Sequence, residues 1–171
     1  WDMHGEVDAF KSKSFLILAP VLPLLTFLLL SVVSKIDPKN QLDGSTKKHG
    51  RLKGALTILM SVVAILIMRA SKDVTVIDLN LIFFFIGVLY VVMGNYMKTI
   101  KPNYFLGIRT PWTLQNEEVW KSTHELGGVV WFIGGSVIVL SCLFFPQGIN
   151  FWIFIGTTAV VAIIPGVYSY L

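Results

Sequence analysis

The side chains best suited to chemistry gather in one polar segment, residues 98–125. Arg109 carries five fixed donors that could clamp a phosphate or a carboxylate. His124 could act as a general acid or base. An enzyme built on this pair would also need a nucleophile or carboxylate facing it, and the glutamates of the segment have no recognisable catalytic spacing. We therefore predict no catalytic residues. The alternative to a non-catalytic protein is a membrane enzyme or transporter that acts on a lipid-like or phosphate-bearing substrate at the inner membrane interface.

Other reactive constellations do not occur in the sequence. Its three histidines, His4, His49 and His124, are far apart, and none has the His/Glu spacing of a zinc protease. The sequence contains no phosphate-binding loop and no serine nucleophile elbow. A single cysteine, Cys142, excludes an internal disulfide framework and a cysteine-rich zinc module. We predict neither a metal site nor a cofactor.

The composition decides the broad class of the protein. Of its 171 residues, 54% are hydrophobic and 14% are charged, whereas an ordinary soluble domain is about 25% charged. Mean hydropathy is +0.71. This excludes an ordinary soluble enzyme and a disordered chain. It also argues against direct nucleic-acid binding, despite the net charge of +4. The chain is predicted to be an integral membrane protein.

Apolar runs then give the fold class, because a spanning helix needs about 20 mostly apolar residues. Five runs qualify, the second only if flanking Lys and Arg side chains extend it: 15–34, 54–68, 79–97, 126–145 and 149–171. A tight turn at 146–148 makes the last two an antiparallel hairpin. We predict an all-α, polytopic transmembrane helix bundle with five spans, and a sixth span before Trp1.

Basic residues in the loops predict the orientation. Segments 35–53 and 98–125 together carry ten Lys and Arg residues, against four in segments 1–14 and 69–78. Cytoplasmic loops are enriched in these residues. Residue 1 is therefore expected outside the cell and Leu171 in the cytoplasm. The basic cluster 47–53 is expected to contact anionic membrane lipids.

Local signals shape the polar segment. Gly107 permits a turn, and Pro111 stiffens the chain and pushes Thr110 toward extended backbone. Asn116 is a good N-cap for a helix that continues through His124.

Two interpretations of this segment stay open. Trp120 and His124 are four residues apart and share a helix face. The segment is either an interfacial helix with anchoring tryptophans, or a recognition surface formed by Arg109, Trp112, Trp120 and His124.

The string Leu106-Gly-Ile-Arg-Thr-Pro-Trp-Thr-Leu114, followed by Glu118-Val119-Trp120, closely resembles the signature of the SdpI family. These are bacterial membrane proteins that give immunity to a secreted peptide toxin. Residues 1–13, the first span and Asp37-Pro38 resemble the end of a domain of unknown function that often precedes the signature. The resemblance divides the chain into 1–53, the end of that domain with the first span and a basic inner loop, and 54–171, a four-span domain with inner signature loop 98–125.

The resemblance also implies a function and partners. It implies protection of the producing bacterium against a membrane-active peptide toxin, and recruitment of a cytoplasmic transcriptional repressor. The partners would be membrane lipids, the toxin and the repressor, at the bacterial cell membrane. The binding residues would be those of the signature loop: Gly107, Arg109, Thr110, Pro111, Trp112, Thr113, Leu114, Glu118, Trp120 and His124.

Small and polar residues recur inside the spans. Two sets on the fourth span repeat every seven residues and share one strip: Gly127, Gly134, Ser141 and Gly128, Gly135, Cys142. Close helix packing explains them, since small residues let helices approach in lipid; a toxin-binding or substrate groove is the alternative. Asn80 and Asn95 in the third span are expected to form hydrogen bonds between helices.

Overall fold

The computed structural model describes residues 12–36, 47–71 and 79–171, and these residues form helices without any strand. In chain order the elements are η1 (Lys13–Ile17), α1 (Leu18–Ile36), α2 (Lys47–Ala70), α3 (Leu79–Met97), α4 (Pro111–Gln115), α5 (Glu117–Phe144) and α6 (Gln147–Tyr168). Within these described ranges, five segments are long and apolar enough to cross a membrane: Lys13–Val33, Gly50–Arg69, Leu79–Met97, Glu117–Phe144 and Gln147–Tyr168. The predicted all-α bundle is confirmed, and the chain is a multi-pass membrane protein. The predicted sixth span, and the upstream-domain resemblance at 1–11 and 37–38, lie outside the described residues.

Several helix ends differ from the apolar runs, and α2 begins at Lys47 rather than at residue 54. Helix α5 starts at Glu117 rather than near residue 126, because Asn116 caps it as predicted. Helix α6 starts at Gln147, so only Phe145 and Pro146 separate it from α5. A proline directly before a helix suits its first turn, where a backbone N–H would have no partner inside the helix.

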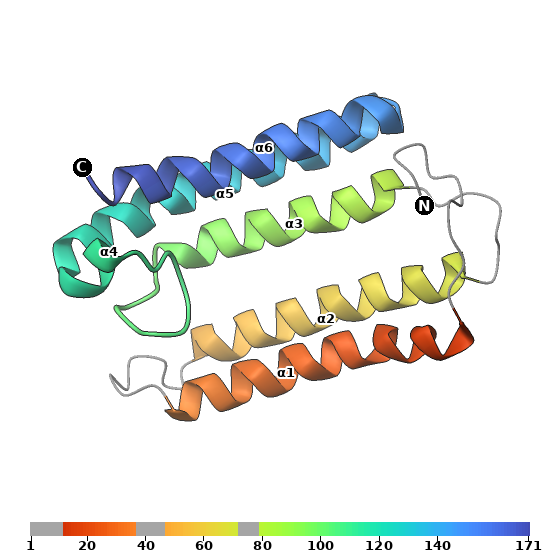
Figure 1. Ribbon diagram of the computed structural model, residues 1–171, viewed down its shortest axis with the longest axis horizontal. Coiled ribbons are helices and arrows are strands. Elements are labelled where there is room, and N and C mark those ends of the chain that lie inside the picture. Colours follow the sequence, from red (N-terminus) through yellow and green to blue (C-terminus); the bar gives the residue numbers. More distant parts are fainter. Residues whose placement is uncertain (1–11, 37–46, 72–78) are drawn as a thin grey trace.

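The helices form two groups. Helices α1 and α2 run antiparallel as a hairpin, and α3, α5 and α6 form a second group, with α4 and the signature loop at one end (Figure 1). Helix α5 is central to the second group, because it packs extensively on both α3 and α6. The contact between α2 and α3, which joins the two groups, is much smaller.

Glycine makes the α3–α5 contact close. A Cβ atom placed on Gly94 would lie 2.5 Å from the backbone nitrogen of Phe132 and 2.8 Å from the carbonyl oxygen of Gly128. About two helical turns further along, a Cβ on Gly135 would lie 2.6 Å from the carbonyl oxygen of Gly87. The two backbones are thus in direct contact, and the prediction that the glycines face other helices is confirmed.

The glycines of the predicted strip pack against more than one neighbour. Gly128 and Gly135 face α3, whereas a Cβ on Gly134 would meet Val161 and Thr157 of α6. Gly127 lies against Ile108 of the signature loop, and Pro165 of α6 is also near. Adjacent residues on a helix point about 100° apart, so the two registers serve two neighbours.

The two asparagines of α3, Asn80 and Asn95, differ in their surroundings. Asn80 of α3 accepts a hydrogen bond of 2.9 Å from the Nδ2 of Asn150 on α6, which confirms its predicted interhelical role. Asn95 is exposed and lines a groove between α2 and α3. Elsewhere the Nε1 of Trp131 on α5 donates to the carbonyl of Val161 on α6 at 3.0 Å. These bonds tie α6 to the other two helices of its group.

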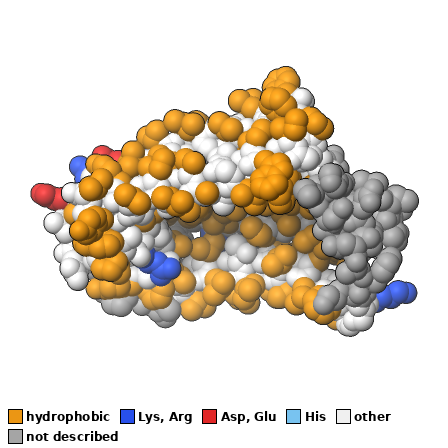
Figure 2. All heavy atoms as spheres, turned by 45° about the horizontal axis from the view of Figure 1, so that its top comes forward, with side chains coloured by type: hydrophobic (Ala, Val, Ile, Leu, Met, Phe, Trp, Pro, Cys, Tyr) orange, Lys and Arg blue, Asp and Glu red, His pale blue; other side chains and the backbone are white. Residues whose placement is uncertain are grey.

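The outer surface is apolar along the spans. Hydrophobic side chains are spread over the described part of the face seen in Figure 2, and charged side chains are sparse there. Helix α1 exposes most of its large apolar side chains, with Leu24 57% and Leu29 53% accessible. Such a surface is stable only in contact with lipid or other apolar partners.

Candidate functional site

The signature loop is organised around Asn103, which is only 1% exposed. Its Oδ1 accepts hydrogen bonds from the backbone N–H groups of Phe105 (2.8 Å) and Leu106 (2.7 Å). Its Nδ2 donates to the carbonyls of Lys101 (2.9 Å) and Leu106 (3.1 Å). One buried amide therefore satisfies four backbone groups and fixes the turn after α3.

His124 holds the next part of the loop to α5. Its Nε2 accepts from the backbone N–H of Ile108 at 3.0 Å, and its Nδ1 lies 2.8 Å from the carbonyl oxygen of Trp120. The backbone N–H can only donate and the carbonyl can only accept, so the ring is neutral with its proton on Nδ1. Both ring nitrogens are thereby committed to backbone groups.

Gly107 makes this approach possible. Its φ is +106°, a left-handed conformation that favours glycine. A Cβ atom at this position would collide with the Nε2 of His124. The predicted turn is confirmed. Two constraints favour glycine at this position: the positive φ and the close approach of the His124 ring.

The string Thr110-Pro111-Trp112-Thr113 forms a capped helix, α4, that sequence reasoning did not predict. Thr110 is extended (φ −102°, ψ 162°), as expected before a proline, and its Oγ1 accepts from the N–H of Thr113. Thr113 is 1% exposed; its Oγ1 accepts from the N–H of Thr110 at 2.9 Å and donates to the carbonyl of Ile108 at 2.9 Å. A threonine N-cap with proline at the first helical position was the available signal.

Trp120 anchors the base of the loop in a buried cluster with Met97 and Ile100. Its Nε1 donates to the carbonyl of Ile100 at 2.9 Å, and its ring stacks on His124 with centroids 4.1 Å apart. The predicted shared face of Trp120 and His124 is confirmed. Their side chains, however, are 1% and 2% exposed, so they hold the loop from inside.

The outward side of the loop carries Arg109 and Trp112. Arg109 is exposed and donates to the carbonyl of Tyr104 at 2.9 Å, which braces the loop against itself. Trp112 is 42% exposed and makes an edge contact with Tyr170, at a centroid distance of 5.0 Å. Glu118, another signature residue, is exposed at the start of α5, where a negative charge suits the helix N-terminus.

A cavity of about 420 Å³ opens beside the loop, between the end of α3 and the start of α5. Trp120 and His124 contribute to its lining, and its charged lining residues carry both signs: Lys98, Lys101, Glu117, Glu118 and Lys121. The cavity therefore combines charged side chains with two aromatic rings.

The structure thus sorts the predicted site residues into two sets. Three of them, Thr113, Trp120 and His124, are interior; Arg109, Pro111, Trp112 and Glu118 are exposed; Gly107, Thr110 and Leu114 are intermediate. Sequence reasoning missed Asn103, whose position directly after Pro102 is typical of a side chain that caps a turn.

The geometry does not favour the enzyme alternative. A general acid or base needs a ring nitrogen that can reach a substrate, and the hydrogen bonds of His124 occupy both nitrogens. Arg109 lies on the outward side of the loop, whereas His124 is buried beneath it. The two side chains do not converge on one reacting centre.

Comparisons with known proteins point to the same segment. Residues 99–169 match the model of the SdpI/YfhL protein family. A stretch of 59 residues is 34% identical to the Immunity protein SdpI of Bacillus subtilis (strain 168), covering 34% of this chain and 28% of that protein. No solved structure matches the chain significantly. The family match contains residues 99–125 of the signature loop together with all of α4, α5 and α6, and it leaves out α1, α2 and α3.

Proposed function

We propose that this chain, whose residues 99–169 belong to the SdpI/YfhL family, is a membrane immunity protein that protects its bacterium against a secreted peptide toxin. The observation that carries the proposal is the 34% identity to a protein named as an immunity protein. The matched stretch covers 28% of that relative, so the toxin and any further partner of this chain are parts of the proposal.

The architecture supports a protective role inside the membrane. A toxin that acts on the bilayer must meet its antagonist there, and most of the described part of this chain lies in helices long and apolar enough to span a membrane. The group α3, α5 and α6 is held by backbone-to-backbone contacts and by the Asn80–Asn150 bond. Such a group offers a fixed apolar surface to a membrane-active peptide.

The signature loop supports a second, recognition role. Its backbone is fixed by Asn103 and His124, so little entropy is lost when a partner binds it. Arg109 and Trp112 stand on its outward side, and residues of these types are enriched in binding hot spots. We propose that Arg109, Trp112 and Glu118 contact a cytoplasmic repressor, and that Thr113, Trp120 and His124 position them. The basic-residue bias of the sequence predicts a cytoplasmic location for this loop, which supports the proposal.

Survival assays test the protective role. The chain is expressed in a toxin-sensitive bacterium that lacks its own immunity protein, and the cells are challenged with a panel of secreted peptide toxins. The proposal expects survival against at least one toxin. Membrane-localised, folded protein that protects against none of them would contradict it.

A paired comparison tests the recognition role. Arg109→Ala removes an exposed guanidinium from the loop, and Arg69→Ala removes one from the far end of α2. If the loop recruits a repressor, Arg109→Ala should release that repressor from the membrane fraction, and Arg69→Ala should not. Equal retention by both variants would restrict the loop to anchoring.

A further inference from the structure

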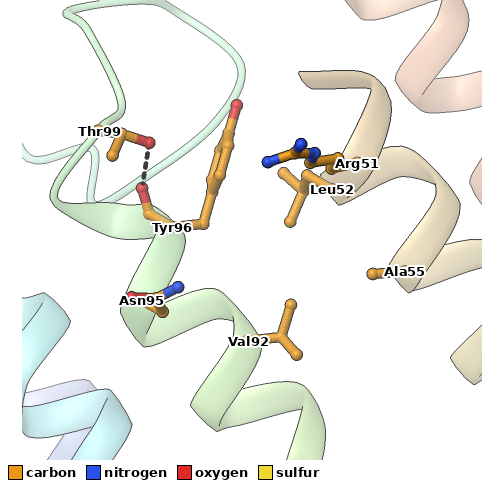
Figure 3. A pocket seen from close by; sticks show the side chains of 7 residues that line it. All are labelled: Arg51, Leu52, Ala55, Val92, Asn95, Tyr96 and Thr99. Atoms are coloured by element: carbon orange, nitrogen blue, oxygen red, sulfur yellow. Dashed lines mark hydrogen bonds between the residues drawn. The ribbon is translucent and has the colours of Figure 1, made fainter. Parts of the chain in front are cut away.

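A second concave site lies where the two helix groups meet, next to the signature loop cavity, with which it shares Thr99 in its lining. This groove, of about 290 Å³, lies between the first turns of α2 and the last turns of α3. Figure 3 shows Arg51, Leu52 and Ala55 of α2 facing Val92 and Tyr96 of α3 across the space between the helices, with Thr99 to one side of it. It lies at the end of the bundle that carries the signature loop (Figure 1).

Polarity changes along this groove. Its polar end carries Arg51 from α2, with Asn95 and Tyr96 from α3. One helical turn further into the bundle, the lining becomes Ala55 and Val92. The two helices are antiparallel, so both sides change together over about 6 Å. The groove is therefore polar at the membrane boundary and apolar toward the membrane interior.

Two basic residues of α2 behave differently. Lys53 is turned toward α1: its Nζ donates to the Oγ of Ser31 at 3.3 Å and lies 4.5 Å from the ring centroid of Phe27. Arg51 instead lines the groove, and in Figure 3 its guanidinium faces the ring of Tyr96 across the opening. Among the described residues, no carboxylate pairs with Arg51.

We propose that this groove binds one anionic phospholipid from the leaflet at the signature-loop end. Its phosphate would accept hydrogen bonds from Arg51, the amide of Asn95 and the hydroxyl of Tyr96, because guanidinium–phosphate bonds are strong and directional. One acyl chain would lie along Ala55 and Val92. The positive-inside bias makes this the cytoplasmic leaflet, which is rich in anionic lipid. This site is separate from the proposed immunity function. The bound lipid would pack between α2 and α3, where the two helices contact each other only over a small area.

Native mass spectrometry of the full chain in detergent tests the site. Parent protein is titrated with dioleoylphosphatidylglycerol, with dioleoylphosphatidylcholine and with inorganic phosphate. Arg51→Gln removes the phosphate donor, and Lys53→Gln is its matched control, two residues along the same helix. Ala55→Phe fills the apolar part of the groove while keeping Arg51. Ile65→Phe makes a similar addition at an exposed position ten residues away, about 15 Å along α2.

The proposal expects the first phosphatidylglycerol to bind the parent at least about tenfold more tightly than phosphatidylcholine, a difference of about 1.4 kcal/mol. Arg51→Gln should remove that preference, and Ala55→Phe should weaken binding of the lipid. Lys53→Gln and Ile65→Phe should bind as the parent does.

Three results would overturn it. Equal weakening by Arg51→Gln and Lys53→Gln would reveal nonspecific surface charge. Undiminished lipid binding by Ala55→Phe would refute the groove even if Arg51→Gln failed to fold. Inorganic phosphate that competes fully with the lipid would identify a free anion as the ligand instead.

Discussion

Replacing Gly94 with alanine tests how tightly α3 and α5 are packed. The added Cβ would lie 2.5 Å from a backbone nitrogen, whereas ordinary contact begins near 3.4 Å, so the helices must separate by about 0.9 Å. A gap of this size removes a quarter to a half of the dispersion energy of each affected contact. Both opposing atoms belong to the backbone of α5 and cannot rotate away.

We expect Gly94→Ala to cost about 1–3 kcal/mol, the usual range for overpacking. Helices in lipid gain no hydrophobic energy from associating, so the lost packing is not offset elsewhere. Gly156→Ala on α6 is the matched control, because a Cβ there meets nothing within 4 Å. Alanine at a compatible position is neutral or stabilises by up to about 1 kcal/mol. The two variants should therefore differ in stability by about 1–4 kcal/mol.

The measurement is unfolding in mixed micelles of dodecyl maltoside and increasing SDS, followed by far-ultraviolet circular dichroism. Gly94→Ala should lose helicity at a lower SDS fraction than the parent, and Gly156→Ala should not. If both variants unfolded together with the parent, the direct backbone contact between α3 and α5 would be refuted.

Three further changes probe the signature loop. Asn103→Ala should leave backbone groups of the loop without hydrogen-bond partners, at a cost of about 1–3 kcal/mol in stability. The amide of Leu106 should then exchange its hydrogen faster than in the parent. Unchanged exchange would contradict the turn geometry. Arg109→Lys should not replace the arginine in repressor retention, because lysine lacks the planar fork; full retention would exclude a bidentate role. A cysteine at Gln115, with Cys142 replaced by serine, should resist an impermeant reagent in intact cells, and labelling there would reverse the orientation.

The spanning helices were predictable because each apolar run is bounded by charged or turn-forming residues in the sequence itself. Capping of α5 by Asn116 was predictable for the same reason, since a cap bonds within three residues. Partners distant in sequence were not. Asn80 was expected to bond another helix, but its partner Asn150 is 70 residues away, and periodicity cannot select one helix among several.

The signature loop shows where local reasoning stopped. The spacing of Trp120 and His124 gave their common face, but it could not give their burial. Burial arises because the chain returns over them after α3, along a path set by Asn103 and Gly107. Short helix α4 was missed because five residues are too few to show a hydrophobic period.

The small contact between α2 and α3 has a consequence for biogenesis. Helix α1, with a mean hydropathy of 2.6 in its span, can leave the translocon early and pair with α2 before α3 has been synthesised. The remaining helices then assemble around α5, which reaches the membrane only after the ribosome has completed the signature loop. We therefore expect the chain to assemble in the membrane in two steps, with the loop folding against α5 at the start of the second step.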